Sequence, residues 1–269
     1  MVALVGYQIF NASVWCDVLK SLGIFVDRGE ATRVWLESES MKWLPGGVWG
    51  YGSRVLSSQK MGVKRASAAL SLIWEVILTN IAWGLLALTI LFSATLRKYC
   101  VVWCESLEWP PLSIVLLGTT LLGLILVIAL KRYKPFREFF VVVMELKKVS
   151  LGRSFESLGK YTVLNAFNLT ALYLVVLATP EASITWHQVL AIGSIAWFVG
   201  FWAIGVPGGI GVREAALVFL MTPFMALEAA MAVAIIWRLT QMSAEIIAVV
   251  FSVLTRMINQ NKEGEYETA

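Results

Sequence analysis

The sequence predicts an all-α membrane protein, a polytopic helical bundle that crosses the bilayer several times. Three observations predict this fold: 58% of the 269 residues are hydrophobic, only 15% are charged, and the apolar residues fall in long runs. A soluble domain of this length carries roughly a quarter charged residues, and its helices show one polar face. Because most of these runs have no polar face, they are typical of spanning helices.

The predicted spanning helices follow one another along most of the chain. The first apolar run, Met1–Cys16, is short for a full span before Asp17, so either it snorkels or the first helix is incomplete. It lacks the basic region and the small-residue cleavage site of a secretory signal. Five later runs each approach the roughly 20 residues that a bilayer requires. They are Ala66–Phe92, Leu112–Leu130, Tyr161–Ala178, Ile184–Gly205 and Ala226–Leu254.

Three other segments are amphipathic, basic or polar. Glu30–Trp43 mixes charged and apolar residues, which predicts an amphipathic helix at the membrane interface. The basic stretch Lys131–Lys148, around the short apolar run Phe139–Met144, is expected to face the cytoplasm. Asn259–Ala269 is polar, so we expect a disordered tail after a single transmembrane domain of residues 1–258.

Two proline–glycine–glycine motifs interrupt the apolar pattern. Their residues are Pro45, Gly46 and Gly47 in KWLPGGVW, and Pro207, Gly208, Gly209 and Gly211 in PGGIGVREA. Proline cannot continue a helix, and glycine lets the backbone approach a ligand closely. The run after the second motif, Ile210–Met221, is too short to span and is followed by Pro223. Each motif is therefore predicted to form a re-entrant or broken helix, and the two to form an internal repeat.

A polar stripe follows each motif along a helix that is otherwise apolar. The stripe residues are Lys64, Ser67, Ser71, Glu75 and Thr79 after the first motif, and Arg238, Gln241, Glu245 and Ser252 after the second. Within each set, the residues recur at helical spacing and share one face. The two stripes therefore predict a shared polar interior.

The two glutamates of the stripes are the most informative residues in them. A charged side chain at the centre of a membrane helix costs about 2.5–3.5 kcal/mol on insertion scales, so Glu75 and Glu245 need partners or water. The alternative is that each is a protonated structural group bonded to a neighbouring helix. Asn165, Asn168 and Ser194 on later spans either line the same interior or join helices by hydrogen bonds.

Two arginines near the motifs predict a phosphate site. A helix that begins after a break directs unpaired N–H groups and its positive dipole end into the adjoining space. Arg54 and Arg213 lie nine and six residues after Pro45 and Pro207, so each can add a charge-assisted bond to a phosphate. For Arg54 an anchor at the cytoplasmic face is an equal alternative. Arg213 and Glu214 are adjacent, so on a helix they need different partners.

These motifs resemble those of the lysylphosphatidylglycerol synthase transmembrane-region family, the flippase-like membrane domains. The resemblance rests on KWLPGGVW with Gly52 and Arg54, on Glu75, on PGGIGVREA, and on Arg238 with Glu245, and it extends over nearly the whole chain. It implies a multi-pass protein of the inner (cytoplasmic) membrane that moves polar-headed lipids between leaflets. The sequence departs from the family in the short first helix, and it contains no soluble synthase domain, so lysine transfer to lipid is not expected.

The leading functional hypothesis is a transporter that flips a polar-headed or glycan-linked lipid between leaflets. In this hypothesis Arg54 and Arg213 hold the phosphate, while Glu75, Glu214 and Glu245 meet a cationic head group or carry protons. The expected partner is a membrane lipid or a lipid-linked glycan. No nucleic acid, cofactor or metal is expected.

Two alternatives belong to other functional classes. A membrane-embedded transferase acting on a lipid carrier would need an acid–base pair or a metal cluster, but His187 is the single histidine and no catalytic constellation is found. An enzyme is therefore not expected. The other alternative is an accessory subunit that docks a cell-envelope glycosyltransferase through the basic loop Lys131–Lys148.

Overall fold

The computed structural model describes residues 1–44, 49–106, 149–179, 183–203 and 206–267; for residues 100, 102–106 and 258–267 it describes the backbone alone. The regular elements in these ranges are all helical, which confirms the predicted all-α class for this part of the chain. Four described helices are long and apolar enough to cross a membrane: Val2–Ser21, Arg65–Phe92, Leu151–Leu177 and Leu227–Met257.

The elements follow one another with short connections. The α-helices are α1 (Val2–Ser21), α2 (Arg28–Glu39), α3 (Trp49–Ser58), α4 (Arg65–Ala87), α5 (Ala94–Ser106), α8 (Leu151–Leu177), α9 (Trp186–Trp202), α10 (Val212–Met221) and α11 (Leu227–Glu267). The 3-10 turns are η1 (Ser40–Trp43), η2 (Gln59–Met61), η3 (Leu88–Phe92) and η5 (Pro207–Gly209).

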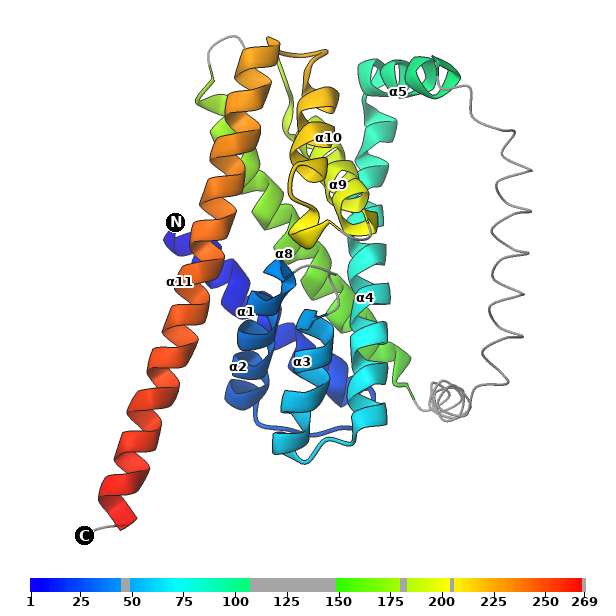
Figure 1. The fold of residues 1–269 in the computed structure, drawn as a ribbon. Coiled ribbons are helices and arrows are strands. Elements are labelled where there is room, and N and C mark those ends of the chain that lie inside the picture. Colours follow the sequence, from blue (N-terminus) through cyan, green and yellow to red (C-terminus); the bar gives the residue numbers. More distant parts are fainter. Residues whose placement is uncertain (45–48, 107–148, 180–182, 204–205, 268–269) are drawn as a thin grey trace.

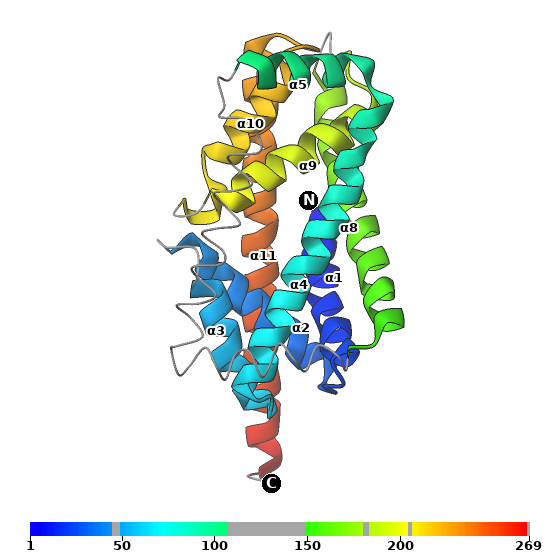
Figure 2. The same cartoon turned by 90° about the vertical axis from the view of Figure 1, so that its right-hand side faces the viewer.

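Two helical hairpins face each other beside the long helices (Figures 1 and 2). The first consists of α2 with η1 and α3, and the second of α9 and α10 with η5 at its tip. Each tip points toward the other near the middle of the bundle, where η1 contacts η5. The long helices α4 and α11 run past both hairpins, and α8 packs against α1, α4 and α9.

Local sequence signals explain the ends of the hairpin helices. The side chain of Asp27 accepts a hydrogen bond of 2.8 Å from the backbone N–H of Glu30, so it caps α2. Thr185 and Gln188 cap α9, since the Gln188 side chain accepts from the Thr185 N–H at 2.8 Å. The helix α10 ends at Met221, before Thr222-Pro223, because proline cannot continue the hydrogen-bond ladder. The predicted short helix after the second motif is thus confirmed.

Each hairpin packs on a different apolar cluster. Trp15, Leu19 and Trp35 are buried in the cluster that joins α1 and α2, whereas Leu172 and Val189 belong to the cluster between α8 and α9. In a membrane, helices associate by close packing rather than by leaving water, and small residues permit it. Gly193 is such a residue, since a Cβ atom there would lie 2.3 Å from a methyl carbon of Leu169.

Several helix boundaries differ from the prediction. The helix α1 does not stop at the apolar run but continues through Asp17 to Ser21, because Asp17 pairs with Arg28 and lies 2.8 Å from Lys160 of α8. The helix α9 has 17 residues and is shorter than the predicted span Ile184–Gly205. The expected disordered tail is helical to Glu267, since it contains no proline and several good helix formers.

The segment predicted to lie on the membrane surface is helical but packs within the bundle. Trp35, Leu36 and Ala31 of α2 are buried, and α2 contacts α1, α3 and α11. The predicted span Leu112–Leu130 and the basic loop Lys131–Lys148 with its apolar run Phe139–Met144 lie outside the described residues.

Candidate functional site

A polar cavity of about 410 Å³ lies where the tips of the two hairpins meet. Four cations and three carboxylates line it, together with the amides of α4, α8 and α11. Part of its wall is aromatic, because the ring of Trp197 stacks on Trp83 and on Phe201 with centroids 4.9 Å apart in each pair. The charged lining residues are Glu39, Lys42, Arg54, Glu75, Arg213, Arg238 and Glu245.

Arg54 and Glu75 form a buried ion pair at one side of the cavity. The Nη1 atom of Arg54 donates to Oε2 of Glu75 at 2.6 Å, and Trp35 Nε1 donates to the other carboxylate oxygen at 2.6 Å. The remaining guanidinium nitrogens donate to Ser38 Oγ at 2.8 Å and to Glu39 at 3.2 Å. Because every one of these groups has a protein partner, the pair serves to join α3, α4 and α2.

Lys42 connects the first hairpin to α11. Its Nζ atom lies 2.9 Å from Oε1 of Glu245 and 3.1 Å from Oε1 of Glu39. Burial lowers the pKa of Lys42, but the two carboxylates outweigh that effect and raise it above its ordinary value. Burial likewise raises the pKa of Glu39, but Lys42 and Arg54 outweigh it and leave the pKa lowered. All three groups of this bridge therefore stay charged near neutral pH.

We expect the stabilising effect of Lys42 to be constant from about pH 4.3 to pH 10.4, the ordinary pKa values of Glu and Lys. Glu39, whose folded pKa is lowered, loses its contribution only as the pH falls through that lower value; Lys42, whose folded pKa is raised, loses its contribution only as the pH rises through it. Unfolding midpoints of wild type and Lys42→Met in detergent, compared across pH, measure this. A difference that changes steadily between pH 5 and pH 9 would contradict it.

Arg238 holds the tip of the second hairpin. Its Nη2 atom donates to the carbonyl oxygen of Gly208 at 2.9 Å, and its guanidinium lies 5.1 Å from the ring centroid of Trp43. The Nε atom is 2.9 Å from Oε1 of Glu214, which makes an ion pair, but its N–H is not directed at that oxygen. The other oxygen of Glu214 accepts from the backbone N–H of Gly211 at 2.7 Å and so caps α10.

The glycines of the second motif permit the close approach of the hairpin tips. Gly208 and Gly209 have φ of +58° and +67°, and Gly211 has φ of +80°, a region that other residues rarely occupy. A Cβ atom at Gly208 would lie 3.0 Å from the ring of Trp43, and one at Gly209 would lie 2.8 Å from the carbonyl oxygen of Gly200. Glycine is therefore required here by both backbone conformation and space.

Arg213 lines the cavity without an ion-pair partner among the described residues, and its Nε atom is buried without a hydrogen-bond acceptor there. Burial, and then the positive charge of Arg238, lower the pKa of Arg213 to about 10, against the opposing effect of Glu245. The guanidinium thus stays protonated at neutral pH. A partly buried cation without a partner favours an anion beside it.

Other polar atoms around the cavity also lack partners. Within the described residues, the unpartnered buried atoms that line it include both acceptors and donors. They are Asn80 Oδ1, Asn165 Nδ2, Asn168 Oδ1, Gln241 Oε1 and Glu245 Oε2. A buried polar atom without a hydrogen bond costs about 1–3 kcal/mol, so this cavity is built to hold a polar occupant.

The structure brings together most of the predicted site residues. Pro207 and Gly208 at the tip meet Arg213, Arg238 and Gln241 around the cavity, which agrees with the predicted shared polar interior. Pro45, Gly46 and Gly47 lie outside the described residues, although Trp43 before them contacts Gly208.

Three expectations are corrected. Arg54 is neither free to bind a phosphate nor at a membrane surface, because it is 2% exposed and its nitrogens bond to Ser38, Glu39 and Glu75. Glu75 has both oxygens occupied by protein donors and so fits the structural alternative. Glu214 caps α10 and pairs with Arg238, so neither of its oxygens is left for a cationic group.

The polar stripe on α4 divides between two environments. Thr79 lines the cavity, but Ser71 accepts a hydrogen bond of 3.2 Å from Trp15 Nε1 in the packed core, and Lys64 is exposed at the start of the helix. Sequence reasoning did not identify Glu39 and Lys42 as site residues. Their only signal is position, since Lys42 precedes the first motif by three residues.

No protein-family model matches the chain, and no curated protein sequence matches it. The functional interpretation therefore depends on the cavity and its side chains.

Proposed function

We propose that the chain is a multi-pass protein of the inner (cytoplasmic) membrane that moves a polar-headed or glycan-linked lipid between leaflets. The observation that carries this proposal is Arg213, a cation in the cavity without an ion-pair partner among the described residues. A lipid phosphate supplies the missing charge, and its head group supplies donors and acceptors to the unpartnered amides. This assignment agrees with the family resemblance of the two motifs.

In this proposal the two hairpins are re-entrant elements that enter the membrane from opposite faces. Their opposed directions in Figure 1 support an inverted repeat, the arrangement in which transporters place substrate between two broken helices near the bilayer midplane. Non-helical backbone at that depth is tolerated where it is buried in protein or lines a polar space. The turn at η5 meets this condition, because the carbonyl oxygen of Gly208 accepts from Arg238.

Lipid movement in liposomes tests the proposal. The purified chain is reconstituted with fluorescent phospholipids that carry anionic, zwitterionic or glycosylated head groups, and a membrane-impermeant quencher reports the accessible leaflet. We expect Arg213→Gln to slow transport roughly tenfold or more, because a charge-assisted bond is lost. Arg213→Lys should retain part of the rate.

Arg65→Gln is the matched control, since Arg65 is an exposed arginine outside the cavity that donates to Gln59. It should transport at the wild-type rate, because exposed substitutions change little. Equal rates for wild type and Arg213→Gln, or no acceleration over empty liposomes with any head group, would refute the proposed function.

A further inference from the structure

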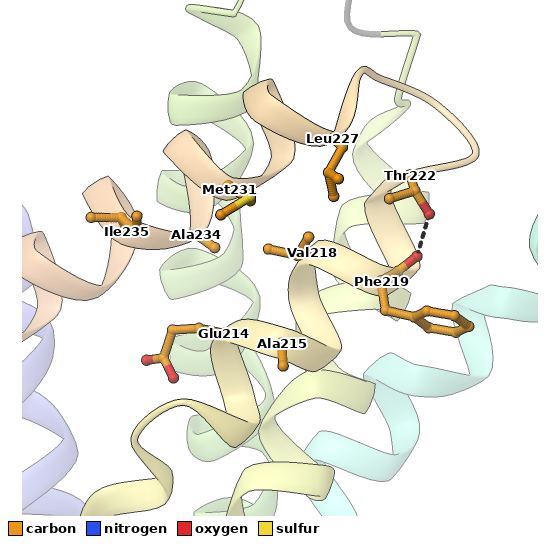
Figure 3. A pocket seen from close by; sticks show the side chains of 9 residues that line it. All are labelled: Glu214, Ala215, Val218, Phe219, Thr222, Leu227, Met231, Ala234 and Ile235. Atoms are coloured by element: carbon orange, nitrogen blue, oxygen red, sulfur yellow. Dashed lines mark hydrogen bonds between the residues drawn. The ribbon is translucent and has the colours of Figure 1, made fainter.

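A second pocket, of about 450 Å³, lies in a groove between α10 and α11 (Figure 3). Its walls are apolar, with Val218, Met231 and Ala234 directed into it, and Glu214 lies at one end. Leu227 and Met231 are about half exposed, at 52% and 48%, so the groove is open along the side of α11. Glu214 is the single charged residue that lines it.

The groove and the polar cavity are neighbours across one ion pair. Arg213 lines the cavity, whereas the next residue, Glu214, lines the groove. Glu214 pairs with Arg238, which lines the cavity. The Arg238–Glu214 pair therefore separates a space that suits a charged head group from a space that suits a hydrocarbon. Because the N–H of Arg238 is not directed at Glu214, the pair lacks the hydrogen bond that makes such contacts strong.

We propose that the groove receives an acyl chain of the lipid whose head group lies at Arg213, and that the Arg238–Glu214 pair is the boundary between the two parts of this ligand. The inference rests on the proposed function and adds the site for the hydrocarbon part. An unbranched, uncharged chain fits because the groove is apolar beyond Glu214.

The position of the groove agrees with the path of a lipid. A head group that has risen to the middle of the bilayer carries its chains into the opposite half. The groove occupies one half of the bundle, from Glu214 near the hairpin tip to Leu227 at the end of α11 (Figures 1 and 3). The eight-residue rise from Glu214 to Thr222 along α10 gives it a length of about 12 Å, close to half of a hydrocarbon core of about 30 Å.

Site-specific photocrosslinking tests this inference in membranes that contain the native lipids. Benzoylphenylalanine is introduced at Ala215, an exposed residue of the groove, or at Ala232, an exposed residue of α11 that does not line it. Mass spectrometry measures the lipid adduct at each position. In the Arg213→Gln background we expect the adduct at Ala215 to fall roughly tenfold, because the head group is no longer held, while the adduct at Ala232 stays constant. Arg213→Lys, which keeps the charge, should retain the adduct at Ala215.

The outcomes separate this inference from the proposed function. An adduct at Ala215 that does not depend on Arg213 indicates bulk lipid only and overturns the inference, even where Arg213→Gln has lost transport. An adduct at Ala215 that depends on Arg213 supports the groove as a lipid site, even where no transport is measured and the proposed function fails. An equal fall at Ala215 and Ala232 also overturns the inference.

Discussion

Replacing Arg54 with methionine is expected to lower the free energy of unfolding by about 3–5 kcal/mol, because it leaves the carboxylate of Glu75 buried without its cation. Arg54 and Glu75 are 2% and 7% exposed, so water cannot replace the lost partner. Ser38 and Glu39 also lose the guanidinium nitrogens that contact them. Titration of the purified protein from mild detergent into a denaturing one, followed by circular dichroism, measures the change.

A double variant distinguishes a charge effect from lost packing. Arg54→Met combined with Glu75→Gln removes both charges and keeps an oxygen that can accept from Trp35 Nε1. We expect it to be more stable than Arg54→Met alone, since a buried pair replaced as a whole costs far less than one left half-paired. A double variant that is as unstable as the single one would show that the ion pair is not the cause.

Gly209→Ala is expected to disrupt the tip of the second hairpin and to cost at least about 2 kcal/mol, since a left-handed conformation alone costs roughly 1–2 kcal/mol for other residues. The added Cβ would also lie 2.8 Å from the carbonyl oxygen of Gly200, an atom of the backbone that cannot move aside without displacing α9. Because η5 places Gly208 against Arg238 and Trp43, lipid transport should fall together with stability.

Gly159→Ala is the control for this substitution. Gly159 lies in the middle of α8, is exposed, and has no atom within 4 Å of an added Cβ. Alanine should raise stability there by roughly 0.5–1 kcal/mol, because it is the better helix former. Thermal unfolding followed by size-exclusion chromatography compares the two variants. A Gly209→Ala protein that unfolds at the wild-type temperature would mean that the tip tolerates a side chain.

Local backbone features were predictable from the sequence. Proline and glycine restrict or permit backbone conformations by themselves, so Pro207, Gly208 and Gly209 predict a turn without knowledge of any neighbour. The short α10 follows from the same motif and from Pro223. The length of an apolar run likewise indicates a helix, although not where the helix ends, since Asp17 continues α1 once Lys160 pairs with it.

Side-chain partners were not predictable in the same way. Helical spacing places Ser71, Glu75 and Thr79 on one face of α4, but it does not say which neighbour that face meets at each level. The face packs against Trp15 at Ser71 and opens onto the cavity at Thr79. Lys42 belongs to no periodic pattern, and its partner Glu245 lies on a helix far along the chain.

The opposed hairpin tips have a consequence for how fast the two halves of the protein can exchange access. At the level where the tips meet, the described contacts are between side chains and turns, namely the Trp43 ring on Gly208 and the bridge from Lys42 to Glu245. Rotation of an indole and release of one ammonium are rotamer changes, which take place in nanoseconds in exposed residues, whereas hinge motions of whole domains take microseconds to milliseconds. The slow step of a catalytic cycle would then be the departure of the cargo and not the rearrangement of the scaffold.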